Sequence, residues 1–352
     1  MRKIPELITD WKKLSRNIDR MLDKAKKSRS IFRPHFKTHQ SLEIGQLFRE
    51  KDIEKITVSS VSMASFFAKE GWKDITIAFP VNLLEIEEIN KLATGIHLNL
   101  LVDSAFSASF LAKNLNYKVG IFIEIDTGYH RSRLLPGDTE IDKIIRLLSA
   151  SDKLDFKGFL THAGHTYSAK GKAEILDIME DAKEKLNQLK VKYIEEFPEI
   201  ITSYGDTPSC SLAADCSGFD EIRPGNFVFY DVMQYHIGSC SLDDIAVAVS
   251  CPVVSVYPER NEIIIYGGAV HLSKEFIEGD NDFKLFGYVV EFTENGWSTP
   301  IPGAYVSSLS QEHGIVKMPG KFINNFKPGD VLGILPVHSC LTSNLLRQNR
   351  NK

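Results

Sequence analysis

Five short segments of the chain combine an amine, a guanidinium, hydroxyls and glycines that could together bind a phosphorylated aldehyde and react with it. They are residues 33–39 (RPHFKTH), 124–131 (EIDTGYHR), 162–167 (HAGHTY), 205–209 (GDTPS) and 223–226 (RPGN). An amine attacks a carbonyl only while it is unprotonated, a state that cationic neighbours and partial burial favour. Lys37 has Arg33, His35 and His39 beside it in the sequence, so we expect Lys37 to be a partly buried amine that forms a Schiff base.

The other segments supply groups for the phosphate and for the ring of such a molecule. Phosphate binds to hydroxyls and to backbone N–H groups in turns of small residues and at helix starts. Residues 205–209 lead into a predicted helix, and Gly225 with Asn226 forms a second turn of this kind. Arg131 can hold an anionic ring oxygen, because a guanidinium stays charged and donates in fixed directions. Taken singly, each segment also fits an ordinary turn or a solvated loop, but their joint occurrence favours one site.

Each of these segments follows an apolar, β-branched run that predicts a strand. Eight such runs occur, at residues 31–32, 56–58, 75–79, 96–102, 119–125, 158–160, 200–203 and 221–222. Helical spacing between them appears at residues 14–25 and 86–93 and in a long charged stretch over residues 170–197. The alternation predicts an α/β fold, a TIM-like (β/α)₈ barrel whose functional residues gather at the carboxyl ends of the strands. A doubly wound open sheet is the alternative.

After Asp231 the pattern changes to short apolar runs separated by Gly, Pro, Asn and Asp, without long helical periods. The runs lie at residues 245–249, 253–257, 263–266, 286–290 and 331–335. This pattern of short apolar runs and turn residues predicts an all-β domain. We therefore expect the barrel over residues 10–231 and a carboxyl-terminal all-β domain over residues 232–352, with residues 1–9 adding a strand to the second domain.

Composition limits the classes of function. The 352 residues include 42 Lys and Arg against 46 Asp and Glu, a net charge of −4, which argues against nucleic acid as the main partner. Five cysteines without a CxxC pair predict neither a disulfide framework nor a thiolate zinc ribbon. The charged amino terminus and the shortness of the apolar runs are typical of a cytoplasmic protein without a membrane partner.

Seven motifs together resemble those of the D-serine dehydratase and D-threonine aldolase family. They are RPHFKTH, DTGYHR, THAGHTY, GDTPS, EIRPGNFVFYD, LSQEHG and PVHSC, which extend from residue 33 to residue 340. That family belongs to the alanine-racemase-like, fold-type III enzymes that use pyridoxal 5′-phosphate (PLP). The resemblance implies an amino-terminal barrel, a carboxyl-terminal β domain and a homodimer.

Site residues are implied by the same resemblance. Lys37 would carry PLP as a Schiff base and would also be the base that removes the α-proton of the substrate. Arg131 would contact the ring oxygen of PLP. The residues that would bind its phosphate are Tyr167, Thr207, Gly225 and Asn226.

His338 and Cys340 are one residue apart, so on a strand their side chains would point to the same face and could reach one ion. A buried cysteine packed as a small hydrophobe is the alternative from spacing alone. The resemblance implies a divalent metal at this position, and a thiolate ligand favours Zn²⁺ over Mg²⁺, Ca²⁺ or Mn²⁺. His165 and His313 are candidate accessory groups that would orient the ring or the metal.

These parts predict a PLP- and zinc-dependent lyase that acts on a β-hydroxy D-amino acid. Zinc as a Lewis acid would make hydroxide a better leaving group, so that elimination converts D-serine to pyruvate and ammonia. If the metal instead supports deprotonation of the hydroxyl, the Cα–Cβ bond breaks, and the protein is a D-threonine (3-hydroxy-D-amino acid) aldolase that yields glycine and an aldehyde. The resemblance associates the cysteine ligand with dehydratases, which favours elimination.

Three other functions are compatible with some of the residues. An amino-acid racemase would need a second base on the opposite face of the cofactor, and no tyrosine of the β domain is marked for it. A PLP-free metal hydrolase would use Asp126 with His35, His162 and His165 as ligands. A non-catalytic PLP carrier would not need the β domain that we expect after residue 231.

Overall fold

The computed structural model describes residues 3–280 and 283–350. The chain divides into two compact units, residues 19–225 and residues 1–18 together with 226–352. We call the first the barrel unit and the second the β unit. By this division, residues 10–18 and 226–231 belong to the β unit.

The barrel unit contains an eight-stranded parallel sheet with the strand order β2-β9-β8-β7-β6-β5-β4-β3. Its strands are β2 (Ile31–Phe32), β3 (Lys55–Val58), β4 (Asp74–Pro80), β5 (His97–Val102), β6 (Val119–Glu124), β7 (Leu154–His162), β8 (Ile201–Gly205) and β9 (Glu221–Ile222). An isolated bridge between His35 and Thr57 joins the segment after β2 to β3. Within it, the Phe36 N–H donates to the Thr57 carbonyl at 2.8 Å. Because this bridge links the two ends of the sheet, the predicted barrel is confirmed over the open-sheet alternative.

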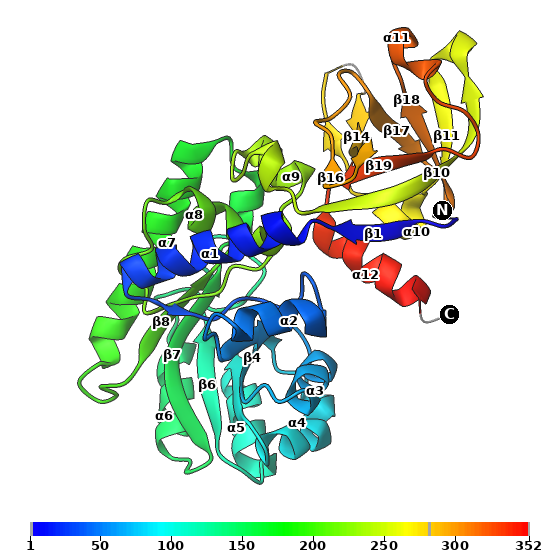
Figure 1. Cartoon of the computed structure of the whole chain (residues 1–352). Helices are drawn as coiled ribbons and strands as arrows, with labels where there is room; N and C mark the ends of the chain where they lie inside the picture. The colour runs from blue at the N-terminus through cyan, green and yellow to red at the C-terminus, as the bar shows by residue number, and fades with distance from the viewer. Residues whose placement is uncertain (1–2, 281–282, 351–352) are drawn as a thin grey trace. The chain divides into compact units, whose positions relative to one another are not determined.

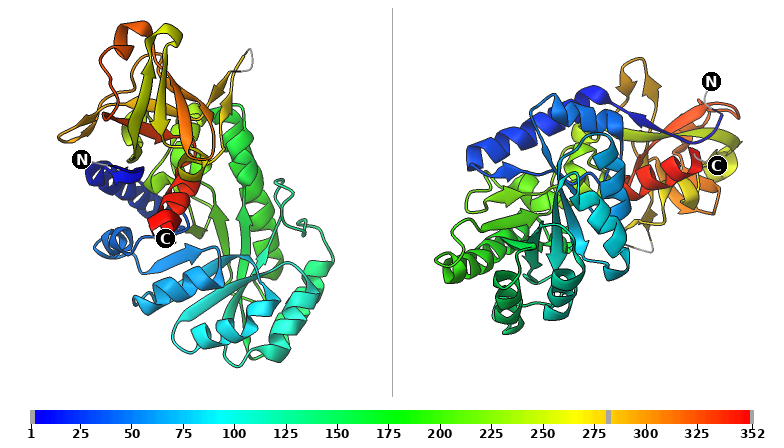
Figure 2. Two further views of the ribbon diagram at one scale, coloured as in Figure 1. Left: turned by 90° about the vertical axis from the view of Figure 1, so that its right-hand side faces the viewer. Right: turned by 90° about the horizontal axis from the view of Figure 1, so that it is seen from below.

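Helices cover the outer face of these strands, as parallel strands buried on both faces require (Figure 1). They are α1 (Trp11–Ser28), of which residues 19–28 belong to this unit, α2 (Leu42–Arg49), α3 (Val61–Lys69), α4 (Ile86–Ala93), α5 (Ala105–Asn114), α6 (Glu140–Ser149), α7 (Lys172–Tyr193) and α8 (Thr207–Leu212). The side chains of Ser41, Ser60 and Ser104 cap α2, α3 and α5 by accepting a backbone N–H three residues on. In both views of Figure 2 the helices of the barrel unit lie around its strands.

The β unit is built on an antiparallel sheet in which β10, β11, β18, β17, β14 and β19 form a closed ring, because β19 pairs with both β14 and β10. A further strand, β1 (Glu6–Thr9), pairs with β10. The ring strands are β10 (Val247–Tyr257), β11 (Glu262–Tyr266), β14 (Gly287–Val290), β17 (Tyr305–Leu309), β18 (His313–Lys317) and β19 (Val331–Pro336). Their inward side chains form one core that includes Val249, Ile263, Ile265, Val289, Val316 and Ile334. The predicted β domain is therefore confirmed.

Short elements complete the β unit. The strands are β12 (Ile277–Glu278), β13 (Lys284–Leu285), β15 (Phe292–Thr293) and β16 (Gly296–Trp297), and the helices are α9 (Val232–Ile237), α10 (Ala269–Leu272), α11 (Gly320–Ile323) and α12 (Ser339–Arg350). The 12-residue helix α12 contradicts the expectation that this part of the chain lacks long helices. Its sequence is rich in Ser, Thr and Asn, which have low helix propensity, but Leu346 packs into the core of the unit.

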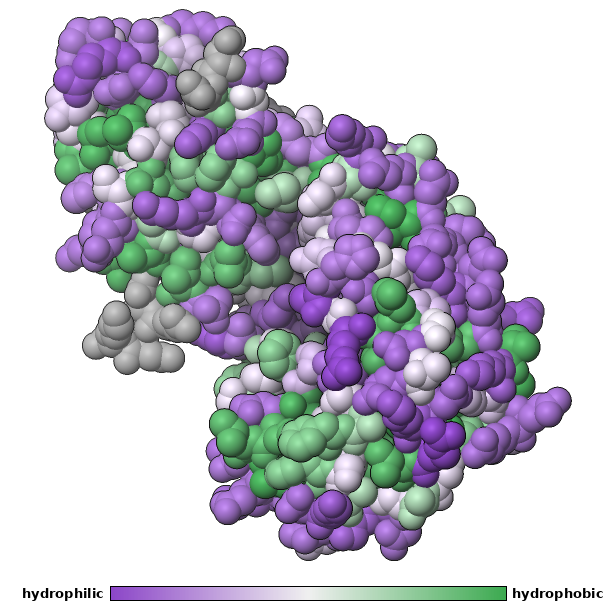
Figure 3. Space-filling model, turned by 180° about the vertical axis from the view of Figure 1, so that it is seen from behind, coloured by the Kyte–Doolittle hydropathy of each residue, from purple (hydrophilic) through white to green (hydrophobic). Residues whose placement is uncertain are grey.

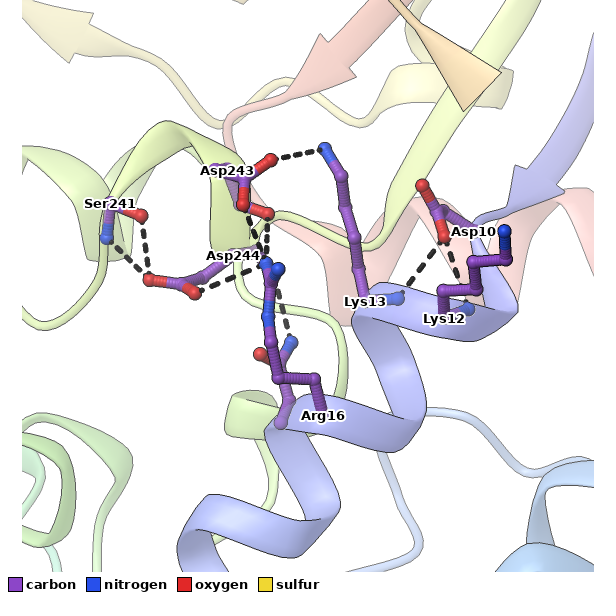
Figure 4. A network of polar contacts seen from close by, with 8 residues as sticks. Asp10, Lys12, Lys13, Arg16, Ser241, Asp243 and Asp244 are labelled. Carbon is purple, nitrogen blue, oxygen red and sulfur yellow. Dashed lines mark hydrogen bonds and ion pairs between the residues drawn. The ribbon is translucent and has the colours of Figure 1, made fainter. Parts of the chain in front are cut away.

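Residues 10–18 are tied to the segment before β10 by polar contacts (Figure 4). Arg16 Nη2 lies 2.8 Å from Asp243 Oδ2, and Asn17 Nδ2 donates to the Asp244 carbonyl at 2.8 Å. The Asp244 carboxylate accepts from the backbone N–H and the hydroxyl of Ser241 at 2.9 and 2.7 Å. These contacts hold the start of α1 beside the turn that leads into β10.

The surface of the protein is mixed in polarity. The face drawn in Figure 3 is mostly hydrophilic, with hydrophobic side chains in scattered groups. Large exposed hydrophobic side chains include those of Phe79, Leu84 and Phe106. Across residues 3–280 and 283–350, no helix is both long enough and apolar enough to cross a membrane.

A buried polar network links four strands of the barrel. Arg33, just after β2, donates through Nε to Glu221 Oε2 and through Nη1 to Asp74 Oδ1, both at 2.5 Å. Ser203 Oγ donates to the other oxygen of Glu221 at 2.7 Å and accepts from Arg223 Nε at 2.7 Å. Burial alone would lower the pKa of Arg33, but Glu221 and Asp74 raise it, so the guanidinium stays charged. The network joins β2, β4, β8 and β9.

We predict that Glu221→Ala lowers the free energy of unfolding by about 3–5 kcal/mol, because it leaves the buried Arg33 charge without its main partner. The measurement is the urea midpoint of the tryptophan fluorescence transition. Glu262→Ala is the control, since Glu262 forms an ion pair with Lys317 at the surface, and surface ion pairs contribute little. A Glu221→Ala midpoint equal to that of the unsubstituted protein would contradict a stabilising role for this network.

Candidate functional site

Lys37 has the only exposed side chain in residues 33–39. Its neighbour Phe36 is fully buried and holds the segment against three aromatic rings at centroid distances of 5.0 Å, those of Phe48, Phe67 and Trp72. The backbone is therefore anchored on both sides of Lys37 while its amine extends from the barrel unit. We expected partial burial of this amine, and the structure instead buries its neighbours.

The segments after β2 and β9 approach each other closely at His35 and Gly225. A Cβ atom at position 225 would lie 2.9 Å from the His35 Cβ and 3.0 Å from the His35 carbonyl oxygen, so only glycine fits there without displacement. Burial lowers the pKa of His35 well below its usual value, and nearby positive charge lowers it further. The charged neighbours that act on it include Lys37, Arg223 and Arg131. His35 is therefore a neutral imidazole beside the Lys37 amine.

Tyr129 is the centre of an aromatic and cationic group at the ends of β6 and β7. Its ring stacks on His165 at 6.2 Å and meets His162 edge-on at 5.8 Å. The Arg131 guanidinium lies 5.5 Å from the same ring. A Cβ at Gly164 would lie 2.4 Å from a Tyr129 ring carbon, so glycine allows this packing.

The two histidines of the HAGH segment differ in their bonding. His162 Nδ1 lies 2.6 Å from the Gly205 carbonyl, which fixes Nδ1 as the protonated nitrogen. Burial lowers the pKa of His162 to about 3, with a further contribution from Arg131, so this imidazole is neutral. His165 Nδ1 is buried and has no hydrogen-bond partner in the described part of the chain, and burial lowers its pKa as well.

Tyr167, Thr207 and Gly225 bring hydrogen-bonding groups together at the ends of three neighbouring strands. The Thr207 N–H donates to the Tyr167 hydroxyl at 3.4 Å, and the Gly225 N–H donates to Thr207 Oγ1 at 3.3 Å. Asp206 caps α8 by accepting from the Ser209 N–H at 2.6 Å. Because these two hydrogen bonds are long, the Thr207 and Gly225 N–H groups can also donate to an anion. Together with the hydroxyls of Tyr167 and Thr207, they match the acceptor oxygens of a phosphate. The donor set therefore fits the phosphate of PLP.

The fourth predicted phosphate residue, Asn226, uses its side chain elsewhere. Asn226 Nδ2 donates to Asp231 Oδ2 at 2.7 Å, to Ser339 Oγ at 3.0 Å and to Cys340 Sγ at 3.4 Å, all within the β unit. Its backbone N–H, next to Gly225, is the group that could bind a phosphate.

The spacing argument for His338 and Cys340 assumed a strand, but the structure places neither residue on one. Strand β19 ends at Pro336 and α12 begins at Ser339, so the pair lies at a strand-to-helix turn. The His338 and Cys340 side chains are nevertheless hydrogen-bonded to each other. Burial alone would lower the pKa of His338, but the bond to Cys340 and the charges of Cys340, Asp231 and Glu275 raise it to about 9. An imidazole and a thiol in contact suit Zn²⁺, which takes nitrogen and sulfur ligands.

Other side chains in the described part of the chain also bear on metal binding. Within residues 3–280 and 283–350, no group of three or more His, Cys, Asp or Glu side chains is arranged to hold a metal ion. The ligand set considered for a PLP-free hydrolase, Asp126 with His35, His162 and His165, is therefore not assembled. His313 is exposed at the start of β18, opposite Tyr266 in the strand register.

Three residues of the site were not assigned a role from the sequence. Arg223 is buried and donates through Nη2 to the Thr161 carbonyl at 2.6 Å, and burial lowers its pKa to about 10. The Tyr129 ring packs against His162 and His165. The Asp231 carboxylate accepts hydrogen bonds from Asn226 and Ser339. Tyr129 and Arg223 stand inside the segments singled out above, but only their three-dimensional partners show what they contact.

Comparisons with known proteins place both units in known families. Residues 9–232 match the family model described as "Alanine racemase, N-terminal domain", and residues 246–349 match "Putative serine dehydratase domain". A protein of Dictyostelium discoideum named D-serine dehydratase is 32% identical over 341 residues, which cover 88% of this chain and 83% of that protein.

Solved structures agree over nearly the whole chain. D-threo-3-hydroxyaspartate dehydratase from Delftia sp. HT23 superposes with a TM-score of 0.90 at 27% identity, covering 98% of this chain and 93% of that one. A cysteine-to-alanine mutant of that dehydratase has been solved in a metal-free form. D-threonine aldolase from Filomicrobium marinum shares the fold, with a TM-score of 0.80 at 21% identity over 97% of this chain and 88% of that one.

We predict that Gly225→Ala weakens the binding of pyridoxal 5′-phosphate by about 10- to 100-fold, since a hydrogen bond to a charged group contributes about 1.5–3 kcal/mol. The added Cβ must push the Gly225 backbone away from His35 and so disturb its N–H. The measurement is a fluorescence titration with the cofactor. Gly137→Ala is the matched control, because a Cβ there meets no atom within 4 Å. Equal affinities for the two variants would contradict the assignment.

Proposed function

Because the chain belongs to the D-serine dehydratase and D-threonine aldolase family of alanine-racemase-like proteins, we propose that it is a PLP- and zinc-dependent lyase that converts D-serine to pyruvate and ammonia. The curated relative named D-serine dehydratase supports the substrate and the reaction. The two-unit fold and the coverage of both family models support an enzyme with the same parts.

One observation carries this proposal. The barrel unit anchors residues 33–39 through buried neighbours and exposes the Lys37 amine alone. The segment after β9 touches the same stretch at His35 and also bonds Thr207. An amine and a set of phosphate donors on adjoining strand ends are what a phosphorylated aldehyde needs.

Lys37 would hold PLP, and its amine would then take the α-proton of the bound substrate. Arg131 would donate to the ring oxygen of PLP, while Tyr167, Thr207 and the backbone N–H groups of Gly225 and Asn226 would bind the phosphate. When bound, PLP supplies an electron sink for the charge left on the α-carbon. His35 and His162 stay neutral because burial lowers the pKa of each. Neither imidazole therefore competes, as a cation, with the proposed phosphate-binding residues.

His338 and Cys340 would hold Zn²⁺. The metal-free form of a cysteine-to-alanine mutant of the related dehydratase supports a cysteine ligand. Bound zinc supplies Lewis acidity that lets the β-hydroxyl depart as hydroxide. Two protein ligands are fewer than the three usual for catalytic zinc, which leaves coordination positions for the carboxylate and hydroxyl of the substrate.

A second reaction and a second substrate use the same residues. Cleavage of the Cα–Cβ bond would make the protein a 3-hydroxy-D-amino acid aldolase, and the aldolase of known structure shares the fold. The Delftia dehydratase acts on D-threo-3-hydroxyaspartate, as its name states, so a larger acidic substrate is the other candidate. The cysteine at position 340 favours elimination.

We also propose that the protein is a homodimer, as the family resemblance implies. Sedimentation equilibrium measures this directly. A monomer at micromolar concentration that retains full activity would contradict the proposal.

We predict that Lys37→Ala lowers the rate of pyruvate formation from D-serine by at least about 10²–10⁴-fold, the usual contribution of a general base. Pyruvate is followed with a coupled lactate dehydrogenase assay, and glycine and acetaldehyde from D-threonine are measured in parallel. Lys51→Ala is the control, because Lys51 is tied to Asp19 away from the site. Aldehyde production that exceeds pyruvate production would identify the aldolase instead.

We predict that chelation abolishes pyruvate formation and that added Zn²⁺ restores it. Cys340→Ala should lose zinc, measured by atomic emission on the dialysed protein, while retaining the absorbance of bound PLP. Cys251→Ala serves as the control, because Cys251 is a buried core residue of the β unit. Activity that survives complete removal of the metal would contradict the zinc half of the proposal.

A further inference from the structure

We propose that Asp231 is a positioning residue for the zinc ligands, and that it acts through Ser339 and Asn226 rather than by touching the metal. The inference rests on the proposed function, because it concerns the site that His338 and Cys340 would form. All of the residues involved belong to the β unit.

The Asp231 carboxylate is buried and accepts four hydrogen bonds. Its Oδ1 accepts from the Gln234 N–H at 2.9 Å and so caps α9. Its Oδ2 accepts from Asn226 Nδ2 at 2.7 Å and from the N–H and hydroxyl of Ser339 at 2.9 and 3.1 Å. One oxygen therefore serves the helix, and the other serves the turn that carries the two ligands.

Ser339 stands between His338 and Cys340, so its fixed backbone determines where both side chains begin. Strand β19 ends at Pro336, and the sheet ladder does not extend to these residues. Asp231 holds the turn at Ser339, and the Met233 N–H, also at the start of α9, donates to the Val337 carbonyl at 3.2 Å. Such outer contacts decide how well a metal site is pre-organised.

The carboxylate also sets the orientation of the Asn226 amide. A carboxylate accepts hydrogen bonds and cannot donate them, so the amide must turn Nδ2 towards Asp231. The same nitrogen then lies 3.4 Å from Cys340 Sγ and presents a donor to the sulfur. The opposite orientation would present Oδ1, which repels a thiolate. In this orientation, Asn226 Oδ1 is buried and has no hydrogen-bond partner in the described part of the chain. That unsatisfied oxygen is the energetic cost of turning Nδ2 towards Asp231.

The test is Asp231→Asn, which preserves size and can keep the cap on α9 through its oxygen. Its new amide nitrogen would face the donors of Asn226 and Ser339 in place of Oδ2. We expect the dissociation constant for Zn²⁺ to rise about 10- to 100-fold, the usual effect of losing an outer contact. Competition with a chromogenic chelator measures it on the PLP-loaded protein. Cobalt(II) titration should show a weakened thiolate charge-transfer band, while PLP absorbance stays unchanged.

Asp244→Asn is the matched control. Asp244 is also a buried aspartate of the β unit whose Oδ2 accepts from a serine N–H and hydroxyl, those of Ser241. Its carboxylate binds Ser241 and Arg16 beside the start of α1, so the zinc affinity of the Asp244→Asn variant should equal that of the unsubstituted protein. A weakening of the same size in Asp244→Asn would reduce Asp231 to a general structural role and overturn the inference.

The remaining outcomes distinguish a failure of the Asp231 inference from a failure of the proposed zinc-dependent function. If the unsubstituted protein binds no zinc, the proposed function fails. If it binds zinc and Asp231→Asn binds equally tightly, only the positioning role fails. Should Asp231→Asn lose its far-UV circular dichroism, the double variant Asn226→Ala/Ser339→Ala replaces it as the test, since it removes two of the three bonds that Asp231 Oδ2 accepts and keeps the cap on α9. Unchanged zinc affinity in the double variant would then overturn the inference.

Discussion

The buried ion pair between Arg33 and Glu221 is the interaction on which the placement of the segments after β2 and β9 depends. It joins β2 to β9, and each of these strands has only two residues, so their ladder offers few backbone bonds. The segments that follow them carry Lys37 and Gly225. Burying two charges is costly unless each is paired and fully hydrogen-bonded. Here Asp74 completes the bonding of Arg33, and Ser203 completes that of Glu221.

The site follows from how the segments beyond those strands are held. Phe36 is packed among aromatic rings, so the adjacent Lys37 backbone is fixed while its side chain is exposed. Gly225 permits the close approach at His35 and places its N–H on Thr207. In the β unit, Asp231 would play a similar part for the proposed ligands His338 and Cys340, because it binds Ser339 in the turn beyond the end of β19.

Much of the fold could be predicted from local pattern. All eight barrel strands fall on the predicted runs, since a parallel strand buried on both faces is mostly apolar, although β9 is the pair Glu221–Ile222. Helix α12 was missed because its Ser, Thr and Asn residues are poor helix formers, whereas tertiary contacts such as the packing of Leu346 and the bond from Thr342 to the Leu272 carbonyl stabilise it. The spacing argument for His338 and Cys340 held for a strand, but β19 ends at Pro336. The role of the Asn226 side chain was also missed, because Ser339 lies 113 residues away in the sequence. The exposure of Lys37 depends on the burial of its neighbours, which charge pattern alone does not reveal.

Reduction of the PLP-loaded protein with borohydride, followed by peptide mass spectrometry, tests the central assignment most directly. Borohydride converts a Schiff base to a stable secondary amine, so the residue that holds the cofactor retains a phosphopyridoxyl group. We expect that group on Lys37 in stoichiometric amount. A phosphopyridoxyl group on another lysine, or none on any, would contradict the assignment of Lys37 as the amine that binds PLP.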